Sequence, residues 1–84
     1  MNKKKKIAIM TSMKKAVDMY LALDAHSSIK DYQKVIKALN HVTKLDVRGK
    51  LPLPEAKKLL GKETTIKEFA RVLIVNLLKR LIKK

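Results

Sequence analysis

The feature that most constrains the fold is a strongly apolar segment, residues 65–82, near the C-terminal end. At 100° per residue, one broad sector of a helix here collects Ile66, Ala70, Leu73, Ile74, Leu77, Leu78, Leu81 and Ile82. Thr65 and Glu68 have the spacing of a capping box at the start of this helix. Phe69 and Val72 lie outside the sector, so the helix is apolar over more than half its circumference. Such a helix must be enclosed, either by the rest of the chain or by a second copy.

Apolar periodicity and end signals predict three further helices. Ser28 is a good N-cap residue, and Asp31 lies in the first turn that follows it. Pro54 and Gly61 bracket a short helix. The predicted fold is all-α, with the other helices wrapped around the C-terminal one. It is a compact bundle of three longer helices, over about residues 9–23, 28–44 and 65–82, and one short helix, over about residues 54–60.

The chain is highly basic, with 21 Lys and Arg residues against seven Asp and Glu and a formal net charge of +14. Consecutive ammonium groups in Lys3–Lys6 repel one another, so residues 1–6 are predicted to be a flexible basic tail before a single helical domain, residues 7–84. A surface of this charge attracts polyanions, which include nucleic acid, anionic lipid and acidic proteins. Codon usage in an AT-rich genome would also favour Lys over Arg, but it does not explain the excess of basic over acidic residues.

Residues that could carry enzyme chemistry are few and scattered. The chain has no Cys, and His26 and His41 are too far apart to be the paired ligands of a helical metal motif. Neither glycine belongs to a phosphate-binding loop. We therefore expect a protein that is not an enzyme and uses no metal, cofactor or small-molecule substrate. No uncharged stretch approaches the roughly 20 residues that span a membrane, and no signal-peptide cleavage site is evident, so a cytoplasmic location is expected.

The sharpest functional signal is a row of basic residues on the outer side of the second helix. We call this row the basic strip, and it consists of Lys30, Lys34, Lys37, His41 and Lys44. Arg48 follows the strip in the next loop. Ammonium groups in a row neutralise backbone phosphates and release their counterions. Gln33 and Asn40 flank the strip, but its lack of Arg favours positioning contacts over base reading. The low aromatic content disfavours stacking on single-stranded bases, so the sequence predicts an accessory protein that binds nucleic acid, most simply duplex DNA. A solvated helix face would show the same pattern.

A different class of function remains open. The chain could be a helical protein–protein interaction module, of the inhibitor, antagonist or immunity type, acting on an acidic protein or at an anionic membrane surface. Its contact surface, which could also form a homodimer through the C-terminal helix, would consist of Phe69, Val72, Leu73, Asn76 and Arg80.

Overall fold

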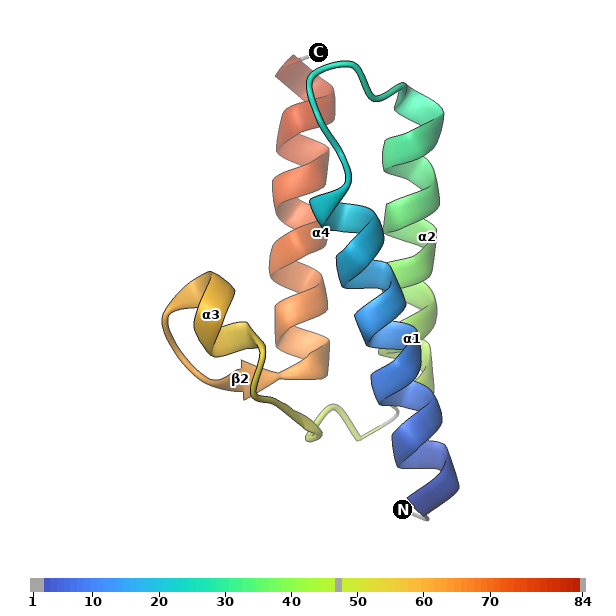
Figure 1. Ribbon diagram of the computed structural model, residues 1–84, viewed down its shortest axis with the longest axis vertical. Coiled ribbons are helices and arrows are strands. Elements are labelled where there is room, and N and C mark those ends of the chain that lie inside the picture. Colours follow the sequence, from blue (N-terminus) through green and yellow to red (C-terminus); the bar gives the residue numbers. More distant parts are fainter. Residues whose placement is uncertain (1–2, 47, 84) are drawn as a thin grey trace.

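The computed structural model describes residues 3–46 and 48–83 (Figure 1). Most of this chain is helical, as predicted, but two short antiparallel strands are added to the expected helices. The elements in chain order are α1 (Lys3–Leu21), α2 (Ile29–Leu45), β1 (Pro52–Leu53), α3 (Ala56–Leu60), β2 (Thr64–Thr65) and α4 (Ile66–Lys83).

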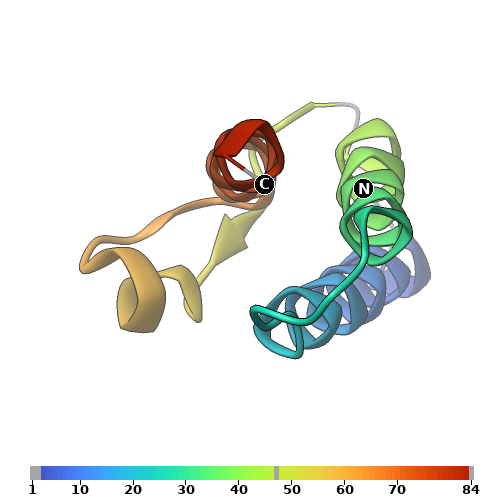
Figure 2. The ribbon, with the colours of Figure 1, turned by 90° about the horizontal axis from the view of Figure 1, so that it is seen from above.

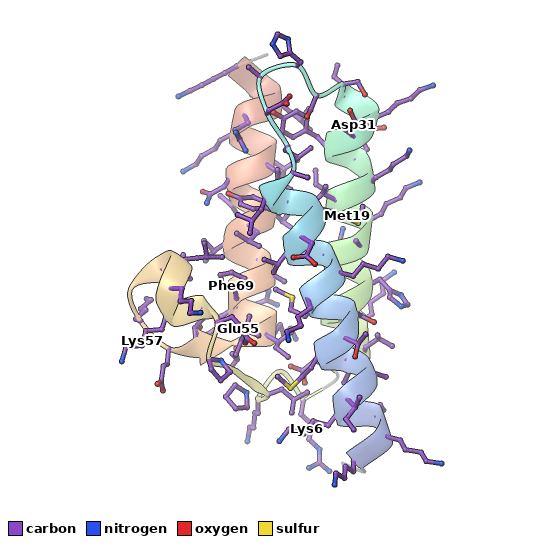
Figure 3. The ribbon with its side chains drawn as sticks, viewed as in Figure 1. Lys6, Met19, Asp31, Glu55, Lys57 and Phe69 are labelled. Carbon is purple, nitrogen blue, oxygen red and sulfur yellow. The ribbon has the colours of Figure 1, made fainter. Side chains whose placement is uncertain are left out.

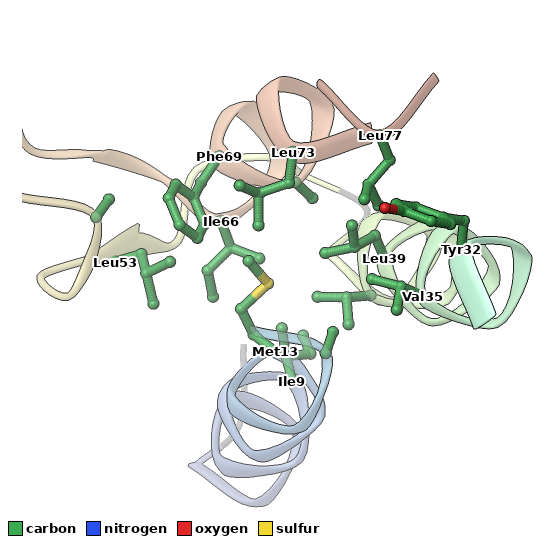
Figure 4. Packing of buried hydrophobic residues seen from close by; sticks show 14 residues of the cluster. Ile9, Met13, Tyr32, Val35, Leu39, Leu53, Ile66, Phe69, Leu73 and Leu77 are labelled. Carbon is green, nitrogen blue, oxygen red and sulfur yellow. The ribbon is translucent and has the colours of Figure 1, made fainter. Parts of the chain in front are cut away.

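The long helices are arranged around α2, which packs extensively against both α1 and α4. Seen from above, α1, α2 and α4 form a bent layer, with α3 lying beyond α4 (Figure 2). The inner side of the bend holds the core, where Ile9 and Met13 of α1 point toward the side chains of α2 and α4 (Figure 4). The fully buried side chains of largest volume include Phe69, Ile9, Met13, Leu39, Ile66, Leu77, Val35 and Val42.

The segment between α2 and α4 covers one end of the core. β1 pairs with β2 in an antiparallel register that places Pro52 opposite Thr65, and the Ile66 amide donates to the Leu51 carbonyl over 2.8 Å. Leu53 and Ala56 are buried as a result. Gly61 ends α3 at φ 78°, a left-handed conformation that favours glycine. This β1–α3–β2 unit was predicted only as a loop and a short helix.

The start of α2 carries a complete capping box. The Ser28 hydroxyl accepts from the Asp31 amide over 3.3 Å, and the Asp31 carboxylate accepts from the Ser28 amide over 2.8 Å. Both free backbone donors are satisfied, so the helix starts where the sequence predicted. The box predicted at α4 is only half formed. The Thr65 hydroxyl accepts from the Glu68 amide over 3.3 Å, but the Glu68 carboxylate accepts from the Thr64 hydroxyl instead.

The N-terminal helix begins earlier than predicted. α1 starts at Lys3 instead of near Ile9, so Lys3–Lys6 form its first turn and are exposed, where a flexible tail was expected. Met1 and Asn2 of the expected tail lie outside the described residues. Lysine is a good helix former, and this propensity outweighs the mutual repulsion of four separated ammonium groups in water.

The C-terminal helix is less enclosed than predicted. Ile66, Ala70, Leu73 and Leu77 face the core as expected, but Leu78 and Ile82 of the predicted inner sector are exposed. The reason is geometric: α2 and the β1–α3–β2 unit cover adjoining parts of α4, and none of the described helices covers its far side. No helix in the described part of the chain is long and apolar enough to cross a membrane.

Candidate nucleic-acid interface

The basic strip lies on the outer side of α2. Its register follows from the buried positions of the same helix, Tyr32, Val35, Leu39 and Val42, which face α1 and α4. The strip residues are offset by about half a turn from that stripe, and all of them are exposed: Lys30, Lys34, Lys37, His41 and Lys44. From Lys30 to Lys44 the strip runs along about 21 Å of helix.

A shallow hollow between α1 and α2 extends the basic surface beyond one helix. The hollow has a volume of about 490 Å³, and it is lined by Ser12, Lys15, Ala16, Met19, Lys37, Ala38 and His41. Small side chains at Ala16 and Ala38 allow the two helices to approach closely, which sets Lys15 across the hollow from Lys37 and His41. Sequence reasoning missed Lys15, because the periodicity of one helix does not reveal which helix lies beside it.

Acidic residues are few on this surface. None of the described residues that line the hollow is acidic. Asp31, near the start of α2, takes part in the capping box with Ser28, and it also lines a neighbouring hollow together with Lys34. Asp46 is buried beyond the end of α2, where its carboxylate accepts from the Gly49 amide over 3.1 Å. Asp18 lines a separate hollow on another face of α1. Basic side chains therefore outnumber carboxylates along the basic strip, and Asp31 lies beside Lys34 near its N-terminal end.

The residues predicted to lie beside the basic strip do not line the hollow. Gln33 and Asn40 are exposed on the edge of α2 away from α1, since the hollow lies on the opposite edge. Arg48 is exposed in the turn after α2, outside the helix that carries the strip. The candidate surface therefore consists of the basic strip of α2 and Lys15 of α1, which lines the same hollow as Lys37 and His41.

The alternative interface on α4 does not form one surface. Phe69 and Leu73 are buried in the protein's own core and cannot reach a partner, which corrects their assignment. Val72 and Asn76 are exposed. The Arg80 guanidinium lies over the Tyr32 ring, 5.8 Å from its centroid. The large apolar side chains that α4 exposes share only Val72 with that predicted surface; they are Val72, Val75, Leu78 and Ile82.

Another hollow lies between α1 and the β1–α3–β2 unit. It has a volume of about 330 Å³, with Met13, Leu53 and Phe69 forming its apolar lining and Lys14, Asp18 and Glu55 its polar lining. Figure 3 shows Glu55 next to Phe69 on this side of the molecule, across α1 from the α2 surface. In the described part of the chain, no group of three His, Asp or Glu side chains is close enough to hold a metal ion.

Comparison with known proteins gives no family assignment, because no protein-family model, curated protein or solved structure matches this chain. Function must therefore be argued from the surface itself.

Proposed function

We propose that this protein is a small accessory protein that binds the phosphate backbone of duplex nucleic acid, most simply DNA. The contact surface is the basic strip of α2 extended by Lys15 of α1. The observation that supports it best is the hollow between the two helices, where ammonium groups line both sides and no described lining residue is acidic. A protein with a net charge of +14 shows some lysine on every face, but this hollow sets lysines of two helices beside each other with no carboxylate among its described lining residues.

The expected binding is electrostatic. Duplex DNA carries one negative charge per about 1.7 Å of its axis, so about 21 Å of helix spans many phosphates. Each phosphate that a lysine neutralises releases condensed counterions, and that release supplies the affinity. Lysine is a flexible point charge without the planar fork with which Arg reads guanine, so these contacts position the protein without selecting a sequence.

Salt dependence tests the proposal, with Lys34→Gln and Lys37→Gln as the first variants. Titration of labelled duplex DNA at several salt concentrations should give a steep loss of affinity as salt rises. Each substitution should make the slope of log K against log salt shallower by about one unit, because each removes one phosphate contact.

A matched pair of variants separates this surface from overall charge. Lys57 and Lys58 are exposed on α3, and Figure 3 shows Lys57 on the far side of the molecule from α2. Lys57→Gln and Lys58→Gln remove the same charge and should leave the slope nearly unchanged. Equal effects of the two pairs would show that binding is a property of net charge alone, and no binding at low salt would end the proposal.

A further inference from the structure

The side of α4 that faces away from the core carries apolar side chains exposed to solvent. The exposed fractions are 39% for Val72, 48% for Val75, 46% for Leu78 and 86% for Ile82. Arg71, Val75, Leu78 and Ile82 follow one another at spacings of four, three and four residues. These four side chains therefore form one row along about 16 Å of the helix. We call this row, together with Val72, the α4 outer face. Contiguous exposed apolar side chains bordered by polar residues mark an interaction site.

The charges around the α4 outer face define the chemistry of its occupant. Arg71 lies within the row, and Lys67, Lys79 and Lys83 lie on the same helix, against a single acidic residue, Glu68. An occupant must therefore offer apolar side chains for the row and negative charge beside them. We propose that the α4 outer face binds an acidic amphipathic helix of a partner protein, with Asp and Glu flanking its apolar stripe.

A second copy of this chain fits the face poorly. Pairing α4 with another α4 would bring Arg71, Lys79 and Lys83 of each copy toward the same residues of the other, between two chains that each carry +14. An acidic helix turns each of these repulsions into an attraction.

An anionic bilayer also fits less well than a helix. Helices that lie in the membrane interface insert their apolar face about 5–10 Å deep and favour Trp and Phe there. The chain has no Trp, its one Phe is buried, and Val75 and Leu78 are only about half exposed. Partly exposed side chains such as Val75 and Leu78 form ridges on a helix that fit the grooves of a second helix.

The α4 outer face is distinct from the proposed nucleic-acid surface. The basic strip points away from the core on α2, and the outer face points away from the core on α4, the helix against which α2 packs. One molecule could therefore hold nucleic acid and an acidic partner at the same time. The two proposals fail independently, because they depend on different residues and different ligands.

The test uses a synthetic acidic helix as the probe. Its sequence repeats three heptads with Ile at a, Leu at d and Glu at e and g, and a control peptide carries Lys in place of Glu. The acidic peptide should bind, with amide chemical-shift changes centred on Val72, Val75, Leu78 and Ile82, and the basic peptide should not. Failure of the acidic peptide to bind, or shifts centred on the basic strip of α2, would overturn the proposal.

Variants assign the binding to the face. The double variant Val75→Ser with Leu78→Ser should lower the affinity for the acidic peptide at least about tenfold. Arg71→Glu with Lys79→Glu, which keeps the apolar side chains, should lower it as much. Leu21→Ser, at an apolar side chain exposed on α1, should have no effect. Circular dichroism checks that each variant is folded. Two other results would overturn the proposal. In both, the two serine substitutions leave peptide binding unchanged; in the first they abolish binding to phosphatidylserine vesicles, and in the second they abolish self-association measured by sedimentation.

Discussion

At the residue scale, Phe69 and Val72 show how little separates core from surface on α4. Both lie outside the apolar sector read from the sequence, and they are three residues apart on the same helix. The structure buries Phe69 completely and leaves Val72 partly exposed. The difference comes from the β1–α3–β2 unit, because Leu53 and the start of α3 lie beside the Phe69 ring (Figure 4).

This contrast predicts very different costs of truncation. Phe69→Ala should destabilise the protein by about 3–5 kcal/mol, because it removes a fully buried ring and leaves a cavity. That is a large share of the roughly 4–13 kcal/mol expected for a domain of this length. Val72→Ala should cost less than about 1 kcal/mol, since its side chain is already partly in water. Chemical denaturation of both variants measures the difference.

The milder variant Phe69→Leu keeps the measurement possible if Phe69→Ala does not fold. Its loss of stability should lie between the losses of Phe69→Ala and Val72→Ala. Similar losses for Phe69→Ala and Val72→Ala would show that the ring is not covered in solution.

At the element scale, the sequence predicted best those helix ends that have local chemical signals. The start of α2 could be read from Ser28 and Asp31, and the end of α3 from Gly61. β1 and β2 could not be read, because strands of two residues have no periodicity and exist only through pairing with each other. The start of α1 was misplaced because a run of lysines carries no capping signal and repulsion was weighed above helix propensity.

The first turn of α1 has unfavourable electrostatics that can be tested. A helix N-terminus carries partial positive charge, and this turn holds lysines without an acidic residue. Lys3→Glu with Lys4→Glu should stabilise the protein by about 0.3–1 kcal/mol per residue at low salt, with the gain fading as salt rises. Thermal unfolding at two salt concentrations measures the effect.

Part of any gain would come simply from lowering the net charge. Lys58→Glu with Lys62→Glu lowers it equally, but Lys58 lies near the C-terminal end of α3 and Lys62 in the loop after it. This pair should therefore stabilise less. Equal gains from the two pairs would mean that the first turn of α1 does not form a helix in solution.

At the scale of the whole molecule, the sequence revealed surfaces on single helices but not those that two helices share. The basic strip could be read from α2 alone, because its apolar stripe fixes which side faces outward. Lys15 could not be added, since that requires knowing that α1 lies along one edge of α2. Of the apolar residues on the α4 outer face only Val72 was predicted, because the sequence does not show how much of the wide apolar sector of α4 is covered by α2 and the β1–α3–β2 unit.

Lys14 and Lys15 offer the most direct test that the nucleic-acid surface spans two helices. They are adjacent in sequence and equally charged, but Lys15 lines the hollow shared with Lys37 and His41, and Lys14 lines the hollow on the side of Glu55. Lys15→Gln should make the salt dependence of DNA binding shallower by about one unit, the effect also expected of Lys37→Gln, and Lys14→Gln should leave it nearly unchanged. Because the two variants have the same net charge and the same helix, only the direction of the side chain can separate them. Loss of slope from Lys14→Gln alone would move the contact to the opposite face of α1, whereas no effect of either would confine it to α2.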